Sequence, residues 1–224
     1  MCFSVEASLT VGAALVPAGI YCIRAGWKKD RRYIPLAVIP LLFAIQQFFE
    51  AGVWAGLDHG YPTLTRWASL GFLFFALGFW PFWLPFAAVP LAPPGPSREL
   101  FYMLVAVGLT FGSVGYCPVA MNTDLWPEAT LVQHSIRYDF SNLPLTVRAG
   151  EGTWAFLYLA IVALPLLLLP DRRIKILGLL LIASAALAFL LFRYAFASVW
   201  CFFAAVLSLY LCLVLNRVPA GPTR

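Results

Sequence analysis

Residues 172–217 read RRIKILGLLLIASAALAFLLFRYAFASVWCFFAAVLSLYLCLVLNR, and this stretch decides the fold class. Only Arg193-Tyr194 interrupts an apolar run that would make one helix of about 40 residues, twice what a bilayer needs. A hydrocarbon core about 30 Å thick is crossed by about 20 residues, because a helix rises about 1.5 Å per residue. The run therefore predicts two membrane-spanning helices, 174–192 and 195–215, joined by a tight turn at Arg193.

The rest of the chain has the same apolar character. Of the 224 residues, 62% are hydrophobic and 11% are charged, and the mean hydropathy is +0.85. A soluble domain carries about 25% charged residues, so a cytosolic enzyme, a disordered protein and a secreted disulfide-rich module are excluded. The predicted fold class is an all-α integral membrane protein with seven transmembrane helices. The predicted spans are 7–26, 33–57, 67–91, 100–118, 153–170, 174–192 and 195–215.

The positions of Lys and Arg indicate the orientation, because cytoplasmic loops of membrane proteins carry an excess of both. With the N-terminus outside, eleven of the 15 basic residues face inward. The four outer ones are Arg66, Arg137, Arg148 and Arg193. We therefore predict an N-out, C-in topology in a single domain over 1–218, followed by a cytoplasmic tail at 219–224. The net charge of +5 then needs no nucleic-acid partner, and membrane lipids are the expected partners.

The loop at 119–150 connects the fourth and fifth spans on the outer side. From Val132 to Phe140, apolar and polar residues alternate, as in a half-buried strand. Turn-forming residues follow at 141–144, and 145–147 would form the returning strand. The pattern predicts a short β-hairpin that caps the helices.

Prolines and glycines predict details of helix packing. Pro81, Pro85 and Pro90 predict that the third span kinks or ends early. The glycines Gly108, Gly112 and Gly115 form a close-packing face in the fourth span, and Gly52 and Gly56 form another in the second.

Glu50 is the one acidic residue, of ten in the chain, that lies inside a predicted span. It lies about 10 Å below the outer interface, at about seven residues from the helix end. An ionisable group at that depth costs on the order of 2.5 kcal/mol unless it meets a partner or a wet cavity. Gln46 and Trp54 share its helix face, and Gln47 borders it. This stripe predicts the lining of an outward-facing pocket, with interhelical hydrogen bonding as the alternative.

The last span carries a stripe of small residues, typical of a packing seam, at Ser198, Cys201, Ala205, Ser208 and Cys212. Cys201 lies at a depth similar to that of Glu50, with Trp200 beside it. Arg193, in the outer turn, would pair with Glu50 or bind an anion. The candidate ligand-binding residues are thus Gln46, Gln47, Glu50, Trp54, Arg193, Trp200 and Cys201, and Glu50 is the candidate catalytic residue.

A divalent metal is the candidate cofactor. His59, His134, Cys2 and Cys201 all map to the outer third and are suitable ligands for zinc or copper. A disulfide between two of Cys2, Cys117 and Cys201 is the alternative use of the outer cysteines.

Three segments carry a resemblance to a known family. They are the opening Met1-Cys2-Phe3-Ser4, the segment 39–47 with Glu50 and Trp54, and the segment 198–205. Over nearly its whole length the chain resembles an uncharacterised family of bacterial seven-helix integral membrane proteins. The resemblance implies this topology and the bacterial cytoplasmic membrane, and it implies no activity. In topology alone the chain is also similar to membrane hydrolases of the ceramidase and adiponectin-receptor kind, which carry three zinc histidines where this chain has two.

Three functions are consistent with these residues. The leading hypothesis is a protein whose pocket around Glu50 binds or senses a small solute, a proton or a lipid. The alternative is a metal-dependent membrane hydrolase that uses Glu50 with His59, His134 and an outer cysteine. The third is an accessory subunit of a membrane complex, or a homo-oligomer.

Overall fold

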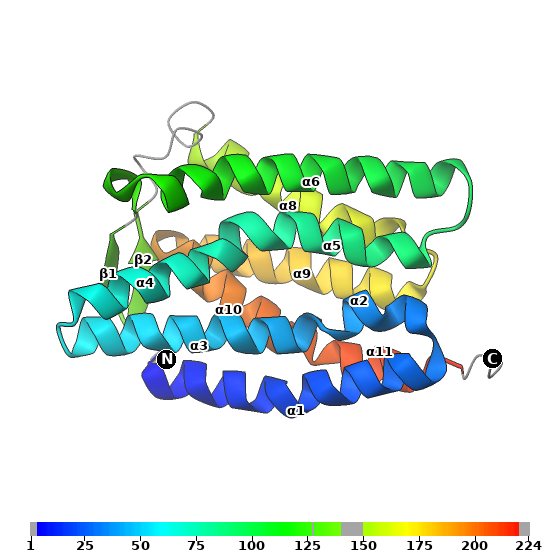
Figure 1. Ribbon diagram of the computed structural model, residues 1–224, viewed down its shortest axis with the longest axis horizontal. Coiled ribbons are helices and arrows are strands. Elements are labelled where there is room, and N and C mark those ends of the chain that lie inside the picture. Colours follow the sequence, from blue (N-terminus) through cyan, green and yellow to red (C-terminus); the bar gives the residue numbers. More distant parts are fainter. Residues whose placement is uncertain (1–3, 127, 140–149, 220–224) are drawn as a thin grey trace.

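The computed structural model describes residues 4–126, 128–139 and 150–219. Its helices run side by side between two ends, and the start of α1 lies at the opposite end from the last residues of α11 (Figure 1). The α-helices are α1 (Val5–Lys29), α2 (Ile34–Ala37), α3 (Ile39–Asp58), α4 (Pro62–Leu73), α5 (Trp80–Ala88), α6 (Pro96–Met121), α8 (Glu151–Leu168), α9 (Arg172–Leu191), α10 (Phe196–Ser208) and α11 (Tyr210–Asn216). Short helical segments are η1 (Arg31–Tyr33), η2 (Phe74–Phe79), η3 (Val89–Leu91), η4 (Thr123–Leu125) and η5 (Arg193–Ala195), and the strands are β1 (Ala129–Val132) and β2 (Ser135–Tyr138).

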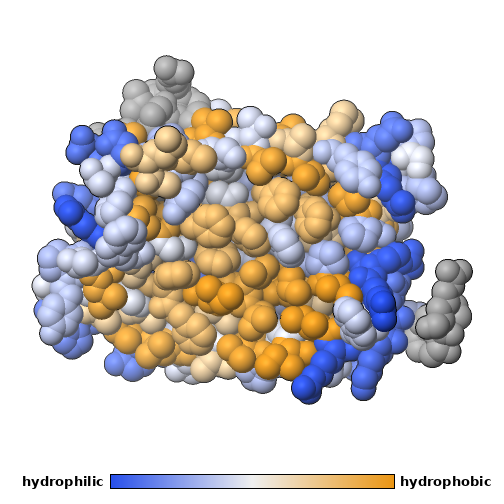
Figure 2. Space-filling model, viewed as in Figure 1, coloured by the Kyte–Doolittle hydropathy of each residue, from blue (hydrophilic) through white to orange (hydrophobic). Residues whose placement is uncertain are grey.

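Consecutive helical segments join into long stretches that overlap the predicted spans. Six of them are long and apolar enough to cross a membrane: Val5–Lys29, Arg31–Asp58, Pro62–Leu91, Pro96–Met121, Arg172–Leu191 and Arg193–Asn216. The apolar helix over Gly152–Leu168 is shorter. Figure 2 shows an apolar band across the helices between two hydrophilic ends. The chain is therefore a helical protein of the membrane class, as its composition predicts.

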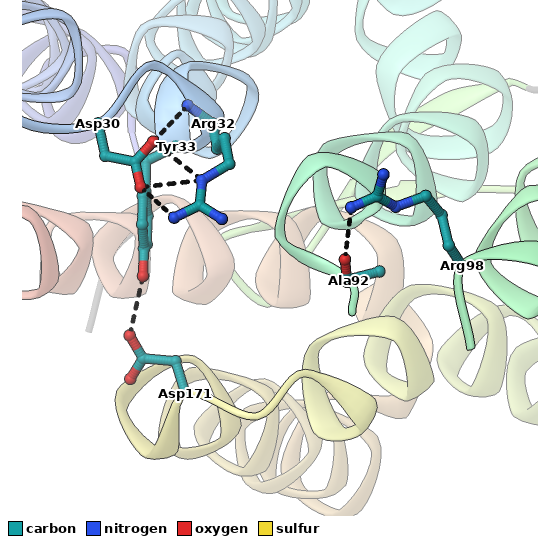
Figure 3. Close-up of polar contacts among 6 residues, drawn as sticks. All are labelled: Asp30, Arg32, Tyr33, Ala92, Arg98 and Asp171. Atoms are coloured by element: carbon teal, nitrogen blue, oxygen red, sulfur yellow. Dashed lines mark hydrogen bonds and ion pairs between the residues drawn. The ribbon is translucent and has the colours of Figure 1, made fainter. Parts of the chain in front are cut away.

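Figure 3 shows polar contacts at the end of the molecule where α9 begins. We call this end the basic end. The Arg32 guanidinium bonds both carboxylate oxygens of Asp30 and lowers the pKa of that carboxyl. The Tyr33 hydroxyl donates to Asp171, whose other oxygen caps α9. Nearby, Arg98 donates to the Ala92 carbonyl. The bond from Tyr33 to Asp171 joins the loop after α1 to the start of α9, and each of the other two contacts joins residues close in sequence.

The prolines of the stretch Pro62–Leu91 predict either a kink or an early end, and the structure shows no early end. The stretch continues to Leu91, and its irregularity is the π-helical segment η2, which comes before Pro81. Because Pro81 has no N–H and its ring crowds the preceding turn, the helix widens there instead of stopping. The backbone of this stretch packs closely on α6, as the glycines of α6 predict. A Cβ at Gly108 would meet the Pro81 carbonyl, and a Cβ at Gly112 would meet the Gly78 carbonyl.

The hairpin also differs from its predicted register. Strands β1 and β2 pair antiparallel, and the turn lies at Gln133 and His134, which both have positive φ. The segment after Val132, predicted as one strand, thus contains the turn and then the second strand. Two residues with left-handed backbone are enough to reverse the chain. The predicted turn and returning strand at 141–147 lie outside the described residues. Ile136 and Tyr138 are buried beneath the hairpin, against Trp54 and Phe72.

Candidate functional site

The buried carboxylate of Glu50 has donors on two helices. Its side chain is 1% exposed in α3. Gln47 Nε2, one turn earlier, donates to Oε2 at 3.1 Å. Ser198 Oγ, from α10, donates to Oε1. The carboxylate therefore joins the second stretch to the last one through a buried hydrogen bond, as interhelical polar contacts in membranes do.

Gln46 extends the same cluster toward the third stretch. Its Oε1 accepts a 2.7 Å hydrogen bond from Trp80 Nε1, and the Trp80 ring stacks on Phe43. Within the described residues, Gln46 Nε2 and Gln47 Oε1 are buried without a hydrogen-bond partner. Such groups are costly to bury unpaired, so they mark a place where a further polar group would be stabilised.

Two side chains connect this cluster to a hollow region. Tyr138 of β2 and Cys201 of α10 are buried, and both interact electrostatically with Glu50. Both also line a cavity of about 530 Å³ that runs from the hairpin end into the helices. Known small-molecule pockets have about this size. Glu50 itself does not line the cavity, and it lies one layer behind the cavity wall.

The cavity has a charged mouth and an aromatic interior. The exposed side chains of Arg137, Asp139 and Arg193 line its hairpin end. Its lining also includes five aromatic side chains, those of Trp154, Tyr158, Phe189, Phe196 and Trp200, of which Tyr158 and Trp200 are buried. A second, apolar cavity of about 60 Å³ adjoins it and shares Tyr158, Trp200 and Cys201.

Trp200 is a buried member of the cavity wall. Its side chain is 7% exposed, stacks on Phe196 and meets the edge of Tyr158. Its indole Nε1 is buried and has no hydrogen-bond partner within the described part of the chain. A buried indole N–H is normally paired, so this donor is an unsatisfied polar group packed behind the cavity surface.

The structure separates the predicted residues into three groups. Gln46, Gln47 and Glu50 form the buried cluster, and Trp200, Cys201 and Arg193 line the cavity. Trp54 does neither, because it packs in the apolar cluster beneath the hairpin. Arg193 does not pair with Glu50, since its guanidinium lies over the Phe189 ring at 5.3 Å.

The candidate metal ligands do not come together in the described residues. No group of three or more His, Cys, Asp and Glu side chains close enough to hold a metal lies among those residues. His59 Nδ1 contacts the Ala55 carbonyl at 2.9 Å, and His134 lies exposed in the hairpin turn. Cys2 lies outside the described residues. Cys117 is exposed and Cys201 buried, and both are free thiols.

Sequence reasoning missed Ser198, Trp80 and Tyr138 as neighbours of the glutamate cluster. Ser198 was visible only as one member of a small-residue stripe, although it lies three residues from Cys201, at the depth of Glu50. A buried carboxylate requires donors, and a hydroxyl at equal depth was the available signal. Arg137 was also missed, because its position at the mouth follows from the true hairpin register.

The pH dependence of protein stability tests whether Tyr138 is buried in this wall. Burial, and then the charge of Glu50 and Cys201, raise the pKa of Tyr138 well above its usual value of 10.0. The unfolded chain therefore loses this proton first, so stability present below pH 10 falls as pH rises. We expect wild-type protein to lose up to about 1.4 kcal/mol more per pH unit above pH 10 than Tyr138→Phe. Urea unfolding at several pH values measures this, and parallel profiles would contradict it.

These features define a helical membrane protein with a buried carboxylate behind the wall of a cavity. The chain belongs to a family of unknown function, DUF6629, which matches residues 1–223. Searches of curated proteins and of solved structures found no significant match. Membership confirms the resemblance to an uncharacterised family, and it brings no activity with it.

Proposed function

We propose that the chain is a seven-span membrane protein, N-out and C-in, of the bacterial cytoplasmic membrane. The start of α1 and the end of α11 lie at opposite ends, which supports an odd number of crossings (Figure 1). The 18 residues of α8 provide the seventh, because about 17 apolar residues are the lower limit for a span. Charge supports the orientation: Lys28, Lys29, Arg31, Arg172 and Arg173 adjoin the helix ends at the basic end, which is then cytoplasmic.

The function that the geometry supports best is binding of a small solute or lipid in the 530 Å³ cavity. The lining side chains at the hairpin end are exposed, so a ligand would enter the cavity there, from the outer side. Its aromatic walls suit an apolar body, and the mouth suits a polar group. Glu50 is in this account a positioning residue: through Ser198 it fixes α10, which carries Trp200 and Cys201.

The single observation that carries this proposal is the cavity of about 530 Å³, with aromatic walls and charged side chains at its hairpin end. Protein interiors are close-packed and leave few voids larger than a water molecule. A hollow of this size and lining therefore favours a ligand over simple packing.

Occlusion of the cavity tests the proposal. Ala197 lines the cavity, whereas Ala186 is exposed on α9 and does not. Native mass spectrometry of protein extracted in mild detergent, and incubated with a lipid extract of its host, is expected to show a bound small molecule. Ala197→Trp should lose at least nine-tenths of it, and the control Ala186→Trp should keep it. Equal retention by both variants, or no bound molecule in wild type, would contradict binding at this site.

A further inference from the structure

The charges at the mouth of the cavity indicate the class of ligand. Arg137 and Arg193 come from elements that pack together, β2 and η5. Among the described residues neither guanidinium takes part in an ion pair or hydrogen bond, although Arg193 lies over Phe189. The third charged residue of the lining, Asp139, already has an interaction partner of its own. The mouth is therefore lined by two guanidinium groups that have no ion pair or hydrogen bond among the described residues.

Two arginines in this arrangement favour an anion over a neutral or cationic group. Guanidinium presents five donors in a planar fork that matches a carboxylate or a phosphate. At the outer face of a membrane these arginines also depart from the rule that basic residues collect on the cytoplasmic side. Positioning in the bilayer thus does not account for them.

The interior selects the rest of the molecule. Trp154 stacks on Phe111 at 3.6 Å between ring centroids, so one aromatic wall is held rigid from behind. Phe196 stacks on Trp200 and forms a second rigid wall. Rigid aromatic walls bury an apolar body with little loss of side-chain entropy. An apolar body that continues from an anionic group would thus fill the cavity from mouth to floor.

We propose that this cavity binds an anionic amphiphile, whose carboxylate or phosphate is held by Arg137 and Arg193 and whose apolar body lies between the aromatic walls. This inference rests on the proposed function, since it names the chemistry of the ligand for the same cavity. The shared chemistry fits a single-chain lipid acid from the bilayer or a water-soluble aromatic acid.

The test compares probes of equal chain and different head group. Binding of radiolabelled dodecanoate, 1-dodecanol and 2-naphthoate to protein in nanodiscs is measured by equilibrium dialysis, with protein-free nanodiscs subtracted. Dodecanoate is expected to bind at least tenfold more tightly than dodecanol. The double variant Arg137→Ala/Arg193→Ala should lose about 100-fold of that affinity, since each charge-assisted hydrogen bond contributes about tenfold. Arg66→Ala, an exposed arginine of α4 outside the cavity, should bind as wild type.

Reversing the charge at both arginines distinguishes recognition of the ligand's charge from a general loss of contacts. In Arg137→Glu/Arg193→Glu, dodecylammonium should bind more tightly than dodecanoate, the reverse of the order in wild type. Tighter binding of 2-naphthoate than dodecanoate would support the proposal and assign a water-soluble acid as the source.

The outcomes separate the two proposals. Equal affinity for dodecanoate and dodecanol, unchanged in the double alanine variant but lost in Ala197→Trp, would overturn anion recognition and leave ligand binding intact. No saturable binding of any probe, in protein that also carries no bound molecule, would overturn both.

Discussion

Glu50→Ala is expected to lower the free energy of unfolding by about 3 kcal/mol, because it leaves two buried donors without an acceptor. Those donors are Gln47 Nε2 and Ser198 Oγ, and a buried unsatisfied group costs about 1–3 kcal/mol. In a chain of this size the Tm should fall by about 6–12 °C. The loss is measured by thermal unfolding in detergent, followed by tryptophan fluorescence.

Two further variants separate the hydrogen bonds from the general cost of mutation. Asp58→Ala removes an exposed carboxylate at the end of the same helix, and should change stability by less than about 0.5 kcal/mol. Glu50→Gln keeps the size and one acceptor, so it should lose less than Glu50→Ala. The double cycle of Glu50→Gln with Ser198→Ala should show a coupling energy of at least about 0.5 kcal/mol. Additive losses would show that the α3–α10 hydrogen bond does not stabilise the fold.

Gly108→Val is expected to be the most damaging single substitution in the packing of the third and fourth stretches. A Cβ at Gly108 would overlap the Pro81 carbonyl oxygen and would lie 2.7 Å from its carbon. Both atoms are backbone, so no side-chain rotation relieves the overlap, and α6 must move away from α5. Overpacking of this kind costs about 1–3 kcal/mol or more, so we expect a Tm lower by at least about 2 °C or failure to accumulate.

Gly152→Ala provides the control for Gly108→Val. A Cβ at Gly152 meets no atom within 4 Å, and its backbone is helical. Its stability should remain within about 0.5 kcal/mol of wild type. If Gly108→Val were equally well tolerated, the close approach of α5 and α6 would be wrong.

The helical fold was predictable because each stretch is decided by local composition. Arg193-Tyr194 alone divides the final apolar run, and the structure places η5 there, between α9 and α10. Long apolar runs leave the backbone no alternative to a helix in a bilayer. Details that depend on single turns were less accessible. The hairpin turn at Gln133 and His134 contains no glycine, so the sequence gives no signal for it. The π-helical segment η2 arises because Pro81 alters the hydrogen bonding of the residues before it.

The site was predictable in part. The cost of burying Glu50 indicated that it must meet donors, and its helical spacing placed Gln46 and Gln47 beside it. The donor from across the bundle, Ser198, and the neighbour Tyr138 depend on how distant segments pack, which no local pattern records. For the same reason the sequence placed Glu50 in a pocket wall, whereas the structure places it behind one.

A structure of the protein in nanodiscs, determined with dodecanoate at saturation, tests the central claim most directly. The account predicts density between the aromatic side chains Trp154 and Trp200, with its polar end at Arg137 and Arg193, and an undisturbed hydrogen bond from Ser198 to Glu50. A cavity closed by inward movement of α8, with dodecanoate excluded from it, would contradict ligand binding at this site.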